Sequence, residues 1–114
     1  MGSRHIELGR QGEGLAAAWY VQHGYRVLAT NWRTPTGEID LLCCRHGVLA
    51  VVEVKTRRST AFGDPAEAVT PAKQRRLRRL AGQYLAAQEH RFARIRFDVV
   101  AILPDRMDVI EDAF

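Results

Sequence analysis

Apolar and polar positions along this chain recur with two different periods, which predict two helices among several strands. Over residues 5–23 the apolar side chains fall on one face at helical spacing, and Gly24 supplies a helix stop. The apolar positions of this first helix are Leu8, Leu15, Ala16 and Trp19. A second helix is predicted after Thr70, a favourable N-cap, with Pro71 in its first turn. Its apolar positions are Leu77, Leu80, Ala81, Tyr84 and Leu85.

Five further segments have the apolar or alternating pattern of β-strands. They are residues 25–29, 38–45, 48–57, 95–103 and 107–110. Pro35 and Gly37 make residues 31–37 a predicted turn, and small and polar residues make 58–65 a predicted loop that we expect to be mobile.

The two longest of the early strands flank His46 and Gly47, which are suited to a tight hairpin because both residues tolerate positive φ. If these two residues form the loop, Arg45 pairs with Val48, and the same register sets Asp40 opposite Glu53. The alternation of strand side chains then puts Lys55 on the face that Asp40 and Glu53 share.

The order of elements is a helix, three strands, a helix, a strand and a short edge strand. It predicts an α/β fold with a mixed sheet, because the second helix can form a right-handed crossover that makes the fourth strand parallel to its neighbour. A chain of 114 residues fits a single domain, 1–114. No apolar stretch approaches the roughly 20 residues that span a bilayer, and no secretion-type segment is evident, so we expect a cytoplasmic protein without a membrane partner.

Charged residues interrupt the two β-rich segments that should form the hairpin. Asp40, Glu53 and Lys55 lie in otherwise apolar runs, where a charge needs a partner or a bound cation. Carboxylates beside a lysine, without a cluster of His or Cys, are typical of a hard-oxygen site for Mg²⁺ or Mn²⁺. Such an ion next to a phosphodiester favours hydrolysis, with Lys55 orienting water or stabilising the transition state. Val54, between the two charged residues, has a backbone carbonyl that could also reach the metal.

Glu13 is a further candidate ligand. It lies three residues before Ala16 and seven before Tyr20, at the flank of the apolar stripe of the first helix. The alternative is that this carboxylate simply reaches solvent.

The formal charge of +4 and the pI near 9.6 favour a polyanionic partner, above all nucleic acid. On the second helix Arg75 and Arg79 project away from the apolar stripe, whereas Lys73 matches the angle of that stripe. The residues that we expect to bind nucleic acid are Arg57, Lys73, Arg75, Arg76 and Arg79. A solvated basic face, which serves only solubility, is the alternative.

Several other polar or aromatic residues have a structural interpretation. The adjacent Cys43 and Cys44 point to opposite faces of a strand and do not form a spaced metal-ligand pair. Asp98 is interpreted as a structural aspartate, and Trp19 and Trp32 as packing residues. Glu38 shares the face of Asp40, but the hairpin register sets it opposite Lys55, where an ion pair is expected.

Taken together, these motifs resemble the YraN-like proteins, bacterial members of the PD-(D/E)xK nuclease superfamily. The segments that carry the resemblance are Gly12-Glu13, Asn31-Trp32-Arg33, Gly37-Glu38-Ile39-Asp40-Leu41, Val52-Glu53-Val54-Lys55-Thr56-Arg57, Gly63 with Pro65, Lys73, Arg96-Phe97-Asp98-Val99-Val100 and Ala113-Phe114.

The resemblance implies a restriction-endonuclease-like αβββαβ core and an endonuclease acting on DNA. It implies metal binding by Asp40 and Glu53, catalysis by Lys55, and a role for Glu13 like that of the helix carboxylate in Holliday-junction resolvases. The Pro-Asp pair of the superfamily is absent, because Ile39 precedes Asp40. Resolution of DNA junctions would require paired sites, as in a homodimer, but the sequence leaves the oligomeric state open.

Three functions are compatible with these residues. The leading hypothesis is a Mg²⁺- or Mn²⁺-dependent nuclease acting on DNA, including branched DNA in repair or recombination. The second is a non-catalytic accessory protein that binds nucleic acid with the same fold. The third is a structural protein in which Asp40, Glu53 and Lys55 form a buried ion-pair network.

Overall fold

The structure is a computed structural model that describes the backbone of residues 2–58 and 69–114, and the side chains from residue 11 onward in those ranges. The predicted loop 58–65, including Gly63 and Pro65, lies outside the described residues from position 59 on, as does the Leu8 side chain.

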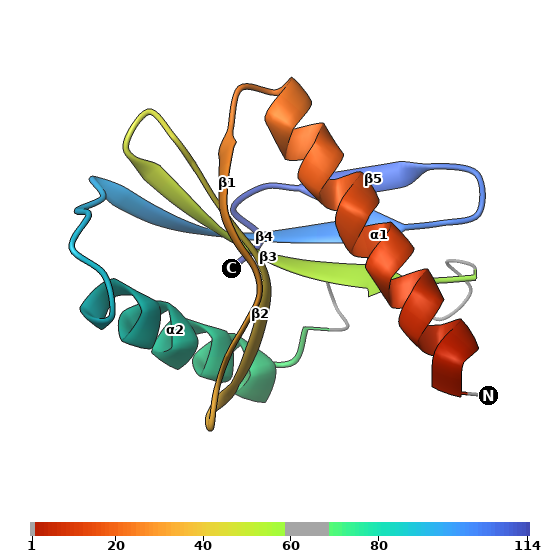
Figure 1. Cartoon of the computed structure of the whole chain (residues 1–114), viewed down its shortest axis with the longest axis horizontal. Coiled ribbons are helices and arrows are strands. Elements are labelled where there is room, and N and C mark those ends of the chain that lie inside the picture. Colours follow the sequence, from red (N-terminus) through yellow and green to blue (C-terminus); the bar gives the residue numbers. More distant parts are fainter. Residues whose placement is uncertain (1, 59–68) are drawn as a thin grey trace.

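A five-stranded sheet lies between two helices (Figure 1). The elements are α1 (Gly2–Gln22), β1 (Arg26–Thr34), β2 (Gly37–Arg45), β3 (Val48–Thr56), α2 (Pro71–Ala86), β4 (Arg94–Ile102) and β5 (Met107–Ile110). The strands follow one another in sequence order across the sheet, and all pairs are antiparallel except β3 and β4. The predicted mixed α/β fold is confirmed and is consistent with a restriction-endonuclease-like core.

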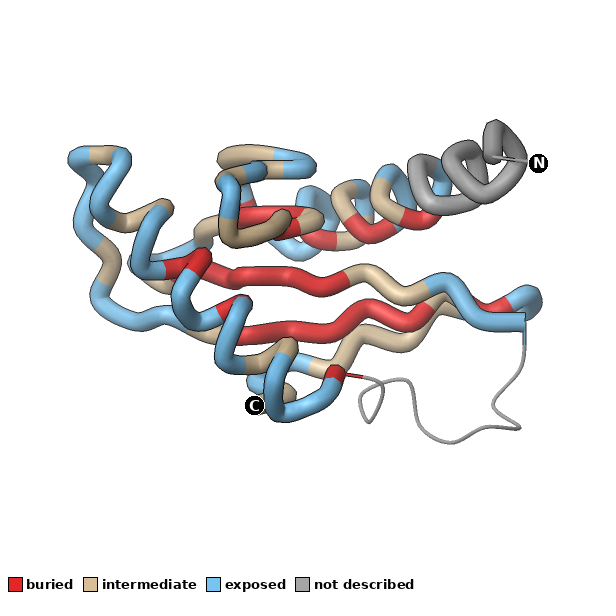
Figure 2. Tube along the Cα trace, turned by 90° about the horizontal axis from the view of Figure 1, so that it is seen from below, coloured by how far each residue is buried: buried red, intermediate tan, exposed pale blue. Residues whose placement is uncertain are grey.

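The two helices cover opposite faces of the sheet (Figure 2), and each helix closes its own apolar cluster. The α1-side cluster comprises Ala16, Tyr20, Tyr25, Leu41, Cys43, Ala50, Val52 and Val100. The α2-side cluster comprises Ile39, Leu42, Leu49, Val51, Val69, Leu77, Leu80, Ala81, Phe97 and Val99. The side chains of one strand therefore serve both clusters by alternation.

The β2–β3 hairpin has the predicted two-residue loop. His46 and Gly47 have φ of 49° and 76°, as a type I′ turn requires. Arg45 pairs with Val48, and the register continues without a shift to Leu41 opposite Val52.

The start and the buried face of α2 also agree with the sequence. The Thr70 hydroxyl accepts a hydrogen bond from the backbone N–H of Lys73 at 3.2 Å, which caps the helix. The buried residues of the helix are Leu77, Leu80 and Ala81, and Tyr84 and Leu85 are partly buried beside them.

The predicted buried face of α1 is only partly right. Leu15 is 54% exposed, whereas Gly12, Ala16 and Tyr20, each one turn apart, are the positions that face the sheet. The helix approaches the sheet so closely at Gly12 that a Cβ there would lie 2.9 Å from Thr56 Oγ1. The contact face therefore begins at a glycine and includes Ala16 of the predicted stripe but not Leu15.

The predicted turn over residues 31–37 is mostly strand. β1 continues to Thr34, and only Pro35 and Thr36 connect it to β2. Trp32 pairs with Ile39 and packs edge-on against Tyr84 of α2, which holds this part of β1 in the sheet. Tertiary packing thus overrides a local composition that favours a turn.

Neither helix is long and apolar enough to cross a bilayer, within the residues that the structure describes.

Candidate metal and nucleic-acid site

The candidate site lies where β2 separates from β3, at Asp40. Ile39 packs on the α2 side of the sheet, yet Leu41, two residues later, packs on the α1 side, so the regular alternation is broken between them. The β2–β3 ladder ends at Leu41 opposite Val52. The predicted Asp40–Glu53 pair is therefore not formed as a ladder pair, and Asp40 Oδ2 instead accepts the backbone N–H of Val54 at 2.8 Å.

Three carboxylates converge at this separation. Oxygens of Glu13 on α1 and of Glu38 and Asp40 on β2 all lie within 4.8 Å of one another. Each side chain is partly buried. The predicted approach of Glu13 to Asp40 is thus present, and we call these three residues the acidic cluster.

Each member of the acidic cluster is held by one neighbour. Asn31 Nδ2 donates a hydrogen bond to Glu13 Oε2 at 2.9 Å, and Arg33 lies 3.4 Å from Glu38 in an ion pair. Asn31 adopts a positive φ of 50° that directs its side chain from β1. The Asn31-Trp32-Arg33 motif therefore supports the cluster from both ends, with Trp32 anchored on α2.

Burial and nearby negative charge both act on the carboxyl group of Asp40. The pKa of its carboxyl rises from 3.8 to about 7, through burial first and the nearby charge of Glu53 second. Glu13 and Glu38 raise the pKa further, and the hydrogen bond from Val54 opposes them. The ionised form of Asp40 is therefore unfavourable here unless a cation binds beside it.

Glu53 points to the other side of the sheet, toward α2. Its carboxylate oxygen Oε1 lies 2.6 Å from Lys73 Nζ and 3.4 Å from Lys55 Nζ, and its side chain is only 6% exposed. Burial lowers the pKa of Lys55, and contact with Lys73 lowers it further. Burial opposes the charged form of Lys73, but the interactions with Glu53 outweigh it and raise the Lys73 pKa.

The predicted set of Glu13, Asp40, Glu53 and Lys55 is therefore split into two groups. The acidic cluster forms one group, and Glu53, Lys55 and Lys73 form the other. Carboxylates of both groups, together with burial, raise the pKa of Asp40. The structure adds Glu38, for which we expected an ion pair with Lys55. That expectation is wrong, because Glu38 pairs with Arg33 and Lys55 pairs with Glu53. The i, i+2 spacing of Glu38 and Asp40 was the signal for their proximity.

The comparison with known proteins identifies the family. A profile described as "Uncharacterised protein family UPF0102" matches residues 12–102. The chain belongs to the UPF0102 family. A UPF0102 protein of Rhodococcus opacus (strain B4) is 42% identical over 98% of this chain and 99% of its own. A UPF0102 protein of Symbiobacterium thermophilum is 48% identical, covering 94% of this chain and 95% of its own. The UPF0102 match spans both groups of the candidate site.

The basic residues expected to bind nucleic acid divide into two kinds. Arg57, Arg75, Arg76 and Arg79 are exposed. Lys73 differs, because it falls on the buried stripe of α2, as its helical angle predicted, and its ammonium contacts Glu53. In this UPF0102 protein, α2 therefore has arginines on its outer face and a lysine that points toward the sheet.

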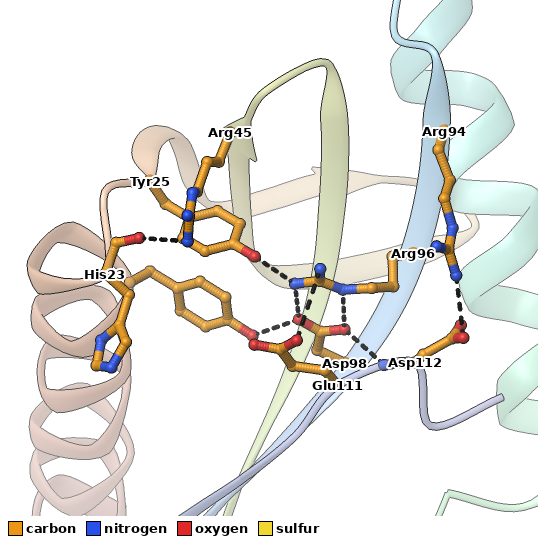
Figure 3. Close-up of polar contacts among 9 residues, drawn as sticks. His23, Tyr25, Arg45, Arg94, Arg96, Asp98, Glu111 and Asp112 are labelled. Carbon is orange, nitrogen blue, oxygen red and sulfur yellow. Dashed lines mark hydrogen bonds and ion pairs between the residues drawn. The ribbon is translucent and has the colours of Figure 1, made fainter.

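Asp98 is a structural residue, as the sequence analysis favoured. It is fully buried and accepts hydrogen bonds from Tyr20 Oη at 2.7 Å, from two nitrogens of Arg96 at 2.8 Å each, and from the backbone N–H of Asp112 at 3.0 Å (Figure 3). Arg96 in turn donates to Tyr25 Oη at 2.7 Å. In this UPF0102 protein the network ties α1 to β4 near Tyr20, two turns after Glu13.

The tryptophans and cysteines pack as expected. Trp19 stacks on His23 with ring centroids 3.8 Å apart, and Trp32 packs on Tyr84. Both cysteines are free; Cys43 is buried in the α1-side cluster and Cys44 is partly buried.

Proposed function

We propose that this UPF0102 protein is a metal-dependent nuclease of the PD-(D/E)xK type, which hydrolyses phosphodiester bonds of DNA. The observation that carries the proposal is the acidic cluster beside Glu53 and Lys55, at the separation of β2 and β3. With DNA as the substrate, we propose a cytoplasmic location.

The donor set fits Mg²⁺ or Mn²⁺. Both ions prefer oxygen ligands, and the three oxygens of the acidic cluster lie within 4.8 Å of one another. Within the described part of the chain, Glu38 alone among them has a cation at ion-pair distance, so negative charge is left over. The pKa of Asp40 is raised by burial first and by this surplus negative charge second, and a divalent cation would relieve the charge.

Val54 adds a neutral oxygen. Its N–H points toward β2 at Asp40, and in a strand the N–H and C=O of one residue point to the same side. The Val54 carbonyl therefore faces the separation of the strands rather than β4. We assign the ion to Asp40, Glu13 and the Val54 carbonyl, with Glu53 as a further ligand after it leaves the lysines.

The chemistry divides between the ion and the chain. When bound, the divalent cation supplies positive charge next to the scissile phosphate and lowers the pKa of the attacking water. Lys55 follows Glu53 on the same face of β3, with its ammonium 3.4 Å from the Glu53 carboxylate, so it is placed to stabilise charge developing on the phosphate. Its lowered pKa also suits it to exchange a proton with the attacking water.

The α2 helix would hold the flanking DNA. Its residues include Lys73 and four arginines but no acidic residue, and most of this charge lies in the first half of the helix. Cations near a helix N-terminus are disfavoured by the helix dipole, so this arrangement costs stability unless anions bind there. DNA phosphates would relieve that cost, with Arg75, Arg76 and Arg79 outward and Arg57 at the end of β3.

The test is a cleavage assay with single-stranded, duplex and four-way-junction DNA, each with and without Mg²⁺ or Mn²⁺. We expect metal-dependent cleavage by the wild type and its loss, by at least about a hundredfold, in Glu53→Ala. Glu89→Ala, which removes an exposed carboxylate beyond α2, should keep full activity.

Binding without cleavage in the wild type would contradict the nuclease and favour the accessory nucleic-acid-binding protein. Selective cleavage of the junction would extend the proposal to branched DNA. That activity needs two sites, so sedimentation of the protein should then show a homodimer.

A further inference from the structure

The distribution of the two kinds of basic residue is uneven. Of the 17 basic residues in the sequence, two are lysines, Lys55 and Lys73, and all others are arginines. Both lysines contact the same atom, Glu53 Oε1, although they come from β3 and α2. Among the described residues, arginine serves both the outer surface and the buried Asp98, whereas the two lysines of the chain meet at this one carboxylate.

The choice of lysine matters physically. Arginine binds a carboxylate with a rigid fork of two donors, whereas the lysine ammonium is a compact point charge on a flexible stem. A lysine can therefore hold a carboxylate through one contact, and its flexible side chain can then carry the ammonium away from it. Lys73 is suited to this, because its side chain is 31% exposed while that of Glu53 is 6% exposed.

Glu53 is not one of the carboxylates of the acidic cluster. The carboxylates whose oxygens converge within 4.8 Å are Glu13, Glu38 and Asp40, and Glu53 is instead engaged at 2.6 Å by Lys73. Glu53 lies close enough to Asp40 that, after burial, its charge raises the pKa of Asp40 more than that of Glu13 or Glu38 does. A cation beside Asp40 can therefore recruit Glu53 once this carboxylate is released from the lysines.

We propose that Lys73 is a positioning residue that holds Glu53 in the metal-free protein and releases it when a divalent cation binds beside Asp40. This inference rests on the proposed metal-dependent function. Lys73 and the cation compete for one carboxylate, so each weakens the binding of the other. Release also leaves the Lys73 ammonium free at the start of α2, next to the arginine face that would hold DNA.

The first experiment titrates Mn²⁺ alone into the protein and follows the free ion by electron paramagnetic resonance. Lys73→Met should bind Mn²⁺ about tenfold more tightly than the wild type, because the competing charge is gone. Arg91→Met removes the same charge from an exposed residue beyond the far end of α2 and should leave the affinity unchanged. Unchanged or weaker binding in Lys73→Met would overturn the proposal.

The second experiment uses the wild-type chain, so it stands even if Lys73→Met folds poorly. A brief reaction with an amine-acylating reagent, read by mass spectrometry, reports on side chains at Lys55 and Lys73 alone. Adding Mg²⁺ should raise the acylation rate of Lys73 severalfold, relative to a small amine in the same tube. An acylation rate that does not change with Mg²⁺ would show that Lys73 stays paired with Glu53, which contradicts the proposal.

The two proposals fail differently. If the wild type binds no Mn²⁺ at millimolar concentration, the metal-dependent function fails and the role of Lys73 fails with it. If the wild type binds Mn²⁺ while Lys73→Met shows no gain and Lys73 acylation stays constant, the positioning role alone is wrong.

Discussion

The backbone N–H of Val54 donates a hydrogen bond to Asp40 Oδ2 at 2.8 Å, just beyond the last ladder pair of β2 and β3. A side chain thus satisfies a donor that a neighbouring strand would otherwise satisfy. The carboxylate is thereby fixed at the separation of the strands, between the acidic cluster on the α1 side and Glu53 on the α2 side.

Asp40 should make the metal-free protein less stable as the pH rises. Folding raises the pKa of Asp40 from 3.8 to about 7, mainly by burial, so the native state binds more protons than the unfolded state between these values. The stability that this group contributes is therefore present at acidic pH and is lost as the pH approaches 7. Asp40→Asn keeps an acceptor for Val54 and should raise the free energy of unfolding at pH 8 by about 1 to 3 kcal/mol.

Urea denaturation between pH 5 and 8 checks this expectation. Asp105→Asn, at an exposed carboxylate, is the control and should follow the wild-type pH dependence. Mg²⁺ should stabilise the wild type at pH 8 more than Asp40→Asn. Parallel pH profiles of the wild type and Asp40→Asn would contradict the assignment.

Gly12 sets the distance between α1 and the sheet. A Cβ at this position would lie 2.9 Å from Thr56 Oγ1 and 3.3 Å from Ile102 Cγ1, so Gly12→Ala should push the helix outward. We expect a loss of about 1 to 3 kcal/mol in the free energy of unfolding. Mn²⁺ affinity should also fall, because the adjacent Glu13 moves away from Asp40.

Gly14 provides a matched control, since a Cβ there meets no atom within 4 Å. Gly14→Ala should stabilise the protein by about 1 kcal/mol through helix propensity. If thermal unfolding shows the same gain for both glycines, the close approach at Gly12 is not a constraint.

Asn31 should tune the metal site without supporting the fold. Asn31→Gly keeps the backbone at φ 50° but removes the donor to Glu13, so Mn²⁺ affinity should fall by about tenfold. His46→Gly makes the same change at φ 49° in the hairpin loop and should leave the affinity unchanged. Isothermal titration measures the Mn²⁺ affinity of both variants. Equal affinities would refute the role of Asn31.

Asp98 should support the fold without affecting the metal. Asp98→Ala leaves Arg96, whose side chain is 12% exposed, without its closest charged partner and should cost about 3 to 5 kcal/mol of stability. Asp112→Asn keeps the backbone N–H that Asp98 accepts and disturbs only an exposed ion pair with Arg94. Its effect should stay within about 1 kcal/mol. Urea denaturation of the two variants measures this difference. Equal shifts of their midpoints would contradict the structural role of Asp98.

The arginine face of α2 should bind phosphates independently of catalysis. Replacing Arg75 and Arg79 together by Gln should lower the slope of log affinity against log salt concentration by about 2, since two phosphate contacts are lost. Fluorescence anisotropy with labelled duplex DNA, without divalent metal, measures this slope. Replacing the exposed Arg91 and Arg106 by Gln removes the same charge outside α2, and a similar slope change there would indicate only non-specific attraction.

Local elements with strong signals follow from the residue types alone. The His46-Gly47 hairpin, the Thr70 cap of α2 and the parallel β4 are all readable from turn chemistry, capping residues and element order. Lys73 was readable as an inward residue, because its helical angle matches the apolar stripe. These features depend on residues close along the chain, and the conformational preference of each residue follows from its type.

Which charges meet depends instead on packing between segments far apart in the chain. The sequence placed Asp40 opposite Glu53 by extending an ideal register, but the ladder ends one residue earlier and the strand alternation breaks. Glu53 instead pairs with Lys73 of α2, on the same side of the sheet, while Glu38 lies with Glu13 and Asp40. Strand divergence and the close approach of α1 at Gly12 arise from packing between distant segments, so no local pattern encodes them.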